Sequence, residues 1–174
     1  MRSKHFAFAI VCVLVPQFGV AQETTDKKAD EVMPAINVSY DNWWFGTREF
    51  SFYPDGSFTF ALHCKRFDSQ VNGTGKLPPE RIEQLLSTLD EKGFFGVSEE
   101  SIESKITQDG GRKVRRTDQT TYRIVVHGAK LRNQIKYYDV YGDAETFPNV
   151  ADLQHLKDSV DEIKRFLSRA ASIE

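Results

Sequence analysis

Cysteine is scarce in this sequence, with only Cys12 and Cys64 among 174 residues. Cys12 lies in an N-terminal apolar run that has the features of an export signal, so a processed chain would keep one thiol and no internal disulfide. The sequence contains no Cys-x-x-Cys and no His-x-x-x-His spacing. We therefore predict no metal site and no cofactor, and a domain that is stabilised by its hydrophobic core alone.

Long apolar runs are also missing. The run at residues 6–15 is too short to cross the bilayer core, which needs roughly 20 residues. It follows a basic N-terminus and precedes the small residues Gly19 and Ala21, which is typical of a cleavable signal peptide. We predict a signal peptide over residues 1–21, export to the periplasm or the cell exterior, and no membrane span after cleavage.

A strong charge of either sign is absent as well. The net charge is −2, and it would become −4 without Arg2 and Lys4, because 21 basic residues would then face 25 acidic ones. A mildly acidic protein has no general attraction to nucleic acid, so we predict no nucleic-acid partner. Basic residues gather locally at Arg112, Lys113, Arg115 and Arg116. This cluster is either an anion-docking loop for an acidic partner or surface polysaccharide, or a solvated loop.

Motifs for catalysis are missing too. The chain has no Gly-x-Ser-x-Gly elbow, and Cys64 falls on the inward face of its expected strand. The segment at residues 73–76, Gly-Thr-Gly-Lys, lacks the spacing of a phosphate-binding loop, and we interpret it as a bend in a strand. No two carboxylates are placed by the sequence to face each other. We name no catalytic residue.

Two segments show the alternation of apolar and polar residues that predicts β-hairpins. The first covers residues 36–64 and turns at Asp55-Gly56, and a weaker strand is expected at 71–77. In this pattern Trp44 shares a face with the apolar residues, and Trp43 lies on the opposite face. The second hairpin covers residues 122–138.

Two amphipathic helices are predicted around these strands. One follows Pro78 and ends at Gly93, and the other covers about residues 150–169. The polar residues 98–118 predict a long exposed loop between them. The fold class is therefore α+β, a mostly antiparallel sheet of four to six strands with two amphipathic helices packed on one face. We expect a polar tail at residues 22–34 and a single domain at 35–171.

The order of several short motifs resembles a family of small exported bacterial domains of unknown function. These are an Asp-Gly hairpin turn, a Leu-rich helix that ends in Gly-Phe-Phe at residues 93–95, a Thr-Asp-x-x-Thr sequence at 117–121, and a Tyr-rich strand end at 137–142. Members of that family often open with Cys-Phe-Gly-x-Cys-Pro, whereas Trp44-Phe45-Gly46 stands near that place here without either cysteine. The resemblance implies an exported address and the α+β fold, and it implies no activity.

The sheet face opposite the helices is the predicted partner-binding face. The alternation assigns to it seven side chains that are aromatic, basic or imidazole: Trp43, Tyr53, His63, Arg123, His127, Lys136 and Tyr138. Trp, Tyr and Arg supply much of the binding energy at protein interfaces; the other interpretation is a solvated sheet face with a few cross-strand aromatic pairs. We therefore expect a non-enzymatic binding or interaction domain of the bacterial envelope, with an envelope or extracellular protein or glycan as partner. A small envelope hydrolase and a secreted inhibitor of a hydrolase stay as alternatives.

Overall fold

The computed structural model describes residues 33–113, 118–128 and 131–170. The predicted signal peptide, residues 22–32 of the predicted tail, and Arg115 and Arg116 of the basic cluster lie outside the described residues. The predicted domain is described from Ala35 to Ala170.

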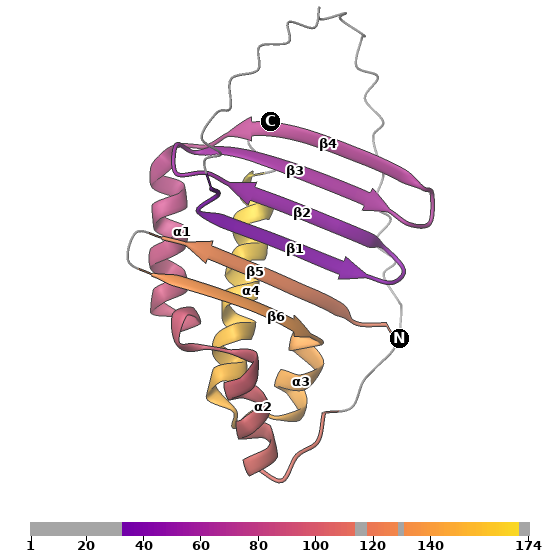
Figure 1. Cartoon of the computed structure of the whole chain (residues 1–174), viewed down its shortest axis with the longest axis vertical. Coiled ribbons are helices and arrows are strands. Elements are labelled where there is room, and N and C mark those ends of the chain that lie inside the picture. The colour runs from indigo at the N-terminus through magenta and orange to yellow at the C-terminus, as the bar shows by residue number, and fades with distance from the viewer. Residues whose placement is uncertain (1–32, 114–117, 129–130, 171–174) are drawn as a thin grey trace, which may run out of the picture. The chain divides into compact units, whose positions relative to one another are not determined.

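Six strands form one antiparallel sheet, which confirms the predicted α+β class (Figure 1). The strands are β1 (Ile36–Asn42), β2 (Gly46–Phe52), β3 (Ser57–Cys64), β4 (Ser69–Lys76), β5 (Thr120–His127) and β6 (Arg132–Tyr138). Their order across the sheet is β4-β3-β2-β1-β5-β6. The first four strands therefore form a meander, the last two form a hairpin, and β1 pairs with β5 to join the two parts.

The helices lie on one face of the sheet, behind it in Figure 1, and the other face is open. The described residues form four α-helices and one 3-10 turn: α1 (Pro79–Glu91), η1 (Phe94–Gly96), α2 (Glu99–Gln108), α3 (Val140–Thr146) and α4 (Ala151–Ala170). The two predicted helices correspond to α1 and α4. Gly93 ends α1 with a φ of 77°, as expected for a left-handed residue after a helix.

The prediction of a long exposed loop at residues 98–118 was wrong, because α2 forms within it. Ser98 and Ser101 make a reciprocal capping box, in which each hydroxyl accepts a hydrogen bond from the other residue's backbone N–H, at 3.0 and 3.2 Å. Ile102 and Ile106, four residues apart, are 0 % and 2 % exposed. Two isoleucines on one helical face are thus enough to attach this short helix to the core, although the segment is otherwise polar.

Helix α3 was also missed by the sequence pattern. It begins after Asp139, whose Oδ1 accepts a hydrogen bond from the backbone N–H of Gly142 at 3.0 Å. Val140 and Ala144 turn into the core and are 0 % and 5 % exposed. Only seven residues form this helix, so the sequence holds too few turns for a 3.6-residue period to stand out.

The core lies between the sheet and the helices. Ile36 and Val38 of β1 pair with Phe52 and Phe50 of β2, and Ile124 and Val126 of β5 face the same side, as the alternation predicts. The fully buried side chains from both layers include Ile36, Phe52, Ile82, Leu89, Phe94, Ile102, Ile124, Tyr137, Leu153, Leu156 and Ile163. The helices therefore cover the middle of the sheet and its β5–β6 side.

Gly73 and Gly75 do not bend β4, which corrects our interpretation of that segment. Both are regular strand positions, paired with Phe60 and Phe58 of β3. A Cβ atom at either glycine would overlap the ring of the phenylalanine across from it. A larger residue at either position would therefore force the phenylalanine ring to shift, because the two rings lie over the backbone of the edge strand.

Candidate functional site

Two turns at one end of the sheet form the most unusual surface of this domain (Figure 1). In the β1–β2 turn, Asn42 Oδ1 accepts hydrogen bonds from the backbone N–H groups of Trp44 at 2.9 Å and Phe45 at 3.2 Å. The side chain of Asn42 thus replaces a strand partner and ends β1. Gly46, with φ of 89°, starts β2. Our placement of Trp43 and Trp44 on opposite faces of one strand was therefore wrong, since both lie in the turn.

The β3–β4 turn lies at the same end because the meander is antiparallel. The backbone N–H of Phe67 donates to the Cys64 carbonyl at 3.3 Å, and Asp68 adopts a left-handed φ of 44° before β4 begins. A Cβ on Gly46 would overlap the carbonyl of His63 and crowd the backbone of Lys65. The β1–β2 turn therefore packs directly against the end of β3.

Four aromatic side chains on these two turns point into solvent. Trp43, Trp44, Phe45 and Phe67 are 72 %, 60 %, 70 % and 68 % exposed, and we call these four residues the aromatic end. They are four of the seven large apolar side chains that are exposed among the described residues. Exposed apolar groups gathered in one place mark interaction surfaces far more often than single exposed groups do.

Charged groups of both signs surround these rings. Lys65 Nζ lies 5.8 Å from the centroid of the Trp43 ring and 3.1 Å from Asp41 Oδ1. The guanidinium of Arg66 lies 5.6 Å from the centroid of the Phe67 ring. Asp68 Oδ1 is 3.7 Å from His63 Nε2. With Asp118, the described residues at the rim of the aromatic end include the cations Lys65 and Arg66 and three carboxylates, and Arg48, directly opposite Leu62, adds a third exposed cation.

The β1–β2 turn is also fastened to the chain that enters β5. Trp44 Nε1 donates a hydrogen bond to Asp118 Oδ1 at 2.9 Å. Asn42 Nδ2 donates to the Asp118 carbonyl and to Thr120 Oγ1, both at 3.3 Å. These contacts tie the β1–β2 turn to the start of β5 and hold the Trp44 ring in place.

An apolar strip on the helix side of the sheet adjoins the aromatic end. Phe58 and Phe50 pack against the core, but Phe60 and Leu62, further along β3, do not belong to it. Leu62 pairs with Val71 of the edge strand, which is 56 % exposed. We call Phe60, Leu62 and Val71 the uncovered strip, because the first two are only half-buried, Val71 is exposed, and none of the three packs against the core.

The predicted partner-binding face is only partly assembled. His63, Arg123, His127, Lys136 and Tyr138 lie on strands, at positions that face away from the helices. Trp43 lies in the β1–β2 turn, and Tyr53 follows β2 at the opposite end of that strand. Arg123 and Lys136 are directly opposite each other. His63 lies on β3, three strands away from β5, which is about 14 Å at the usual strand spacing.

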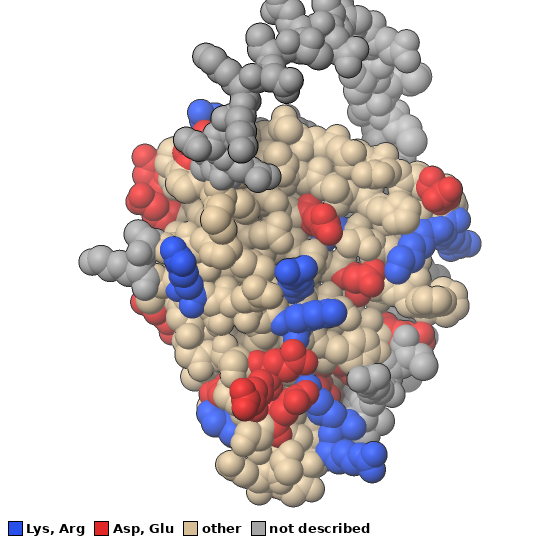
Figure 2. Space-filling view, in the orientation of Figure 1, with Lys and Arg blue, Asp and Glu red and all other residues tan. Residues whose placement is uncertain are grey.

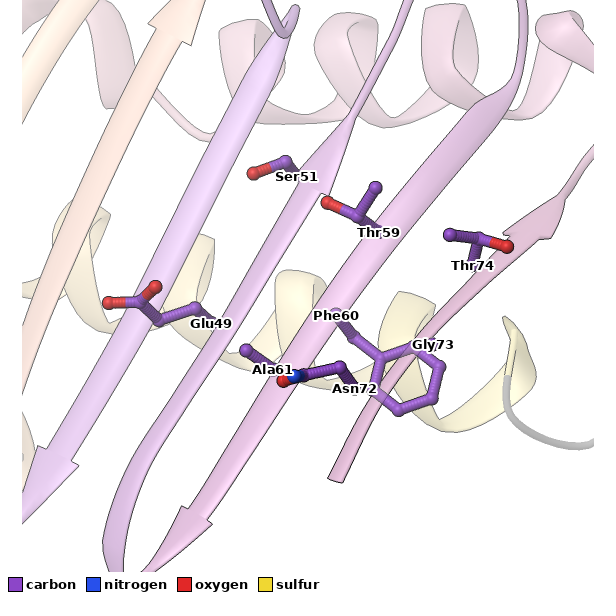
Figure 3. Close-up of a pocket in the computed structure, with 8 residues that line it drawn as sticks. All are labelled: Glu49, Ser51, Thr59, Phe60, Ala61, Asn72, Gly73 and Thr74. Atoms are coloured by element: carbon purple, nitrogen blue, oxygen red, sulfur yellow. The ribbon is translucent and has the colours of Figure 1, made fainter. Parts of the chain in front are cut away.

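The rest of the open face is mainly small and polar, as the alternative interpretation of a solvated face expects. Figure 2 shows mostly uncharged side chains there, with isolated positive and negative ones between them. A shallow hollow of about 510 Å³ lies over β2, β3 and β4 (Figure 3). Its lining residues are Glu49, Ser51, Thr59, Phe60, Ala61, Asn72, Gly73 and Thr74. Glu49 is the one ionisable side chain among the described residues of this lining, so those residues do not supply the second group that acid–base hydrolysis requires.

The described part of the basic cluster is divided between solvent and the domain surface. Arg112 is exposed. Lys113 Nζ lies 3.0 Å from Glu103 Oε1 and 3.9 Å from the centroid of the Tyr137 ring. Lys113 is therefore engaged in attaching the segment after α2 to the domain, and its charge is already balanced.

A network of tyrosines and charged groups lies under the sheet, between β5, α3 and α4. Tyr141 Oη donates to Asp161 Oδ1 at 2.6 Å and accepts from Lys164 Nζ at 2.9 Å. The same ammonium lies 5.2 Å from the centroid of the Tyr122 ring. Burial raises the pKa of Tyr141, and the hydrogen bond and negative charge of Asp161 raise it further. This phenol stays protonated at physiological pH, and the network serves to attach α3 to α4.

The described residues hold no group of three or more His, Cys, Asp or Glu side chains placed to bind a metal ion. Within the same part of the chain, none of the helices is long and apolar enough to span a bilayer. No protein-family model and no curated protein matches this sequence, so the resemblance to small exported domains stays a prediction.

Three of the four rings of the aromatic end were missed by the sequence reasoning. Trp43 was chosen, but as a member of the open face. The alternation placed Trp44 on the apolar face of a strand, and it assigned no role to Phe45 or Phe67. The signal for a turn was present in Asn42 and Gly46, which are turn-forming residues on either side of the three aromatic residues.

Proposed function

We propose that this chain is an exported, non-enzymatic binding domain of the bacterial envelope, and that the aromatic end is its contact surface. One observation carries the proposal: four aromatic side chains, 60 % to 72 % exposed, project from two adjacent turns. A solvated turn needs none of these rings, since glycine, asparagine and aspartate alone supply its geometry. The free energy of burying them is therefore available to a partner.

The composition of the aromatic end matches that of binding hot spots. Trp and Arg are enriched in them, and both are present here as Trp43, Trp44 and Arg66. The hydrogen bond from Trp44 to Asp118 fixes the turn in advance, which reduces the entropy lost on binding. The described residues that line the hollow over β2–β4 include one ionisable group, Glu49, so they support binding better than hydrolysis.

Export is the second part of the proposal, and it depends on the features of residues 1–21 in the sequence. A chain that carries its binding surface as exposed aromatic rings and is sent out of the cytoplasm fits a role at the envelope, in the periplasm or outside the cell. The mature protein would meet proteins, glycans and lipids there.

Fractionation of a bacterial host that expresses the full chain tests both parts. We expect a processed protein that begins after Ala21 and sediments with the envelope. The double variant Phe45→Ser/Phe67→Ser should move to the soluble fraction with an unchanged melting temperature. The matched control is Leu131→Ser, which removes an exposed leucine (37 % exposed) in the β5–β6 turn, at the other end of the sheet.

Retention of residues 1–21 in the cytoplasm would contradict export. Equal loss of the envelope-bound form in the Leu131→Ser control would contradict the assignment of binding to the aromatic end.

A further inference from the structure

We infer that the aromatic end binds the interface of a phospholipid bilayer whose headgroups are mainly zwitterionic, with its rings at the boundary between headgroups and acyl chains. This inference rests on the proposed function, and it names the ligand of the same surface.

The shape of the aromatic end suits a soft partner. The two turns lie at one end of the sheet (Figure 1), their four rings are mostly exposed, and the hollow over β2–β4 includes none of them. A rigid small ligand needs a concave site that encloses most of its surface. A lipid interface needs no such site, because headgroups move aside around projecting rings.

The side chains are those that proteins place at lipid interfaces. Trp is enriched where one part of a residue meets apolar chains and another meets water. Lys65 and Arg66 lie beside the Trp43 and Phe67 rings. Their long apolar stems allow the rings to enter the interface while the charged groups stay among the headgroups.

The charges distinguish between kinds of membrane. Among the described residues, three cations (Lys65, Arg66 and Arg48) and three carboxylates (Asp41, Asp68 and Asp118) lie at the rings or beside the uncovered strip, and Lys65 is already paired with Asp41 at 3.1 Å. Attraction to an anionic surface grows with each uncompensated Lys or Arg, and here the carboxylates offset it. A rim with both signs instead complements headgroups that carry a phosphate and an ammonium group together. Binding is therefore driven by apolar burial and depends little on salt.

The uncovered strip extends the same surface. Phe60, Leu62 and Val71 lie on the two strands that lead to the Phe67 turn, on the side away from the open face. When the β3–β4 edge tilts towards the bilayer, Val71 (56 % exposed) enters the interface next to Phe67. The strip thereby supplies apolar area beyond the four rings.

The chain provides its own probe, because its only two tryptophans, Trp43 and Trp44, both belong to the aromatic end. The purified mature protein would be mixed with protein-free vesicles of phosphatidylcholine and phosphatidylethanolamine. We expect a blue shift of tryptophan emission, quenching by lipids brominated near the headgroup, and flotation with the vesicles. Raising the salt tenfold, or replacing a third of the lipid with phosphatidylglycerol, should change the apparent affinity by less than about threefold.

Phe45→Ser/Phe67→Ser keeps both tryptophans and should weaken vesicle binding by roughly tenfold or more. Val71→Ser should weaken it by a smaller factor, and Leu131→Ser should leave it unchanged. Melting temperatures close to that of wild type would show that a variant binds vesicles less well for a reason other than unfolding.

The possible failures are distinguishable. Wild-type protein that sediments with envelopes through the aromatic end but shows no emission shift with any vesicle would overturn the lipid assignment, leave the proposed function in place, and point to a protein or glycan. Binding only to anionic vesicles, and lost in salt, would overturn the zwitterionic assignment. Binding to neither envelopes nor vesicles would overturn the proposed function as well.

Discussion

The indole Nε1 of Trp44 and the carboxylate Oδ1 of Asp118 are 2.9 Å apart, and this hydrogen bond links the β1–β2 turn to the chain that enters β5. Trp44→Phe keeps an aromatic ring but removes the donor. Because both groups are exposed, we expect a loss of about 0.5–1.5 kcal/mol in unfolding free energy and a modest weakening of vesicle binding, because the turn is no longer fixed in advance. Urea denaturation measures the first and flotation the second. Asp118→Asn keeps an acceptor and should be closer to wild type; a larger loss from Asp118→Asn than from Trp44→Phe would contradict the assigned hydrogen bond.

Leu156 tests the position of α4 over the sheet. It is 0 % exposed, so Leu156→Ala should lower the free energy of unfolding by about 2–5 kcal/mol, the usual range for truncating a buried leucine. Chemical denaturation monitored by circular dichroism gives the value. Glu162→Gln, on the same helix, keeps its volume and should cost much less. Similar losses for both variants would show that this side of α4 is not core.

Ile102 tests whether α2 belongs to the core. Its side chain is 0 % exposed although its neighbours in sequence are polar. Ile102→Ala should cost about 2–4 kcal/mol, whereas Ser104→Ala, on an exposed position of the same helix, should change stability by less than about 0.5 kcal/mol. If Ile102→Ala unfolds at the same denaturant concentration as wild type, Ile102 is not part of the core. The exposed loop that the sequence pattern predicted would then be the better description of this segment.

Gly73 tests the ring packing at the sheet edge. Gly73→Ala places a methyl group where the Phe60 ring lies, and we expect it to cost about 1–3 kcal/mol through overpacking. Phe60→Leu should recover part of that loss in the double variant, since the smaller side chain leaves room. Thermal melts of the two single variants and the double variant give the coupling. Strict additivity would mean that the ring can move aside freely.

Asp152 predicts a pH dependence of stability. Burial alone would raise the pKa of its carboxyl, but hydrogen bonds from Lys105 and Ser101 and the charge of Lys105 hold that pKa below its ordinary 3.8. Lys105 Nζ is 2.8 Å from Asp152 Oδ1 and joins α2 to α4. A lowered pKa in the folded state contributes stability that is present above pH 4 or so and disappears as the carboxyl is protonated.

Asp152→Asn should therefore destabilise the protein by about 1 kcal/mol at pH 7, a modest value because Lys105 is half exposed. The difference from wild type should shrink towards zero as the pH falls below 4. Denaturation at a series of pH values measures it. A difference that stays constant from pH 7 to pH 3 would mean that the ion pair does not account for the loss.

The sequence predicted the parts of this fold whose pattern repeats several times. The strands of both hairpins and the stripes of α1 and α4 each contain enough apolar residues for the period to be clear. Helix α2 has two buried isoleucines, and α3 has seven residues. Tertiary packing determines such short elements more than local preference does, so they escaped prediction.

The candidate site was less predictable than the fold. An alternation pattern assigns each residue of a strand to a face, but it does not show where the strand ends. The side chain of Asn42 ends β1 one residue before Trp43, which moves both tryptophans from the sheet faces to its end. Phe67 lies beside the two tryptophans because the antiparallel meander brings the β1–β2 and β3–β4 turns to the same end of the sheet. No local sequence pattern shows that two such turns are neighbours.

The pairing of β1 with β5 has a consequence for how this chain folds. Ile36 of β1 pairs with Val126 of β5, and we call the junction between these two strands the seam. All other strand pairs join strands that follow each other in sequence, whereas the seam closes a long loop. Closing that loop costs chain entropy before its contacts form. The core depends on it, since Phe52 of the meander meets Phe166 of α4 with ring centroids 5.2 Å apart. The two parts of the sheet each consist of local pairs, and neither has a completed core until β1 and β5 meet, so we expect this seam to form late in folding.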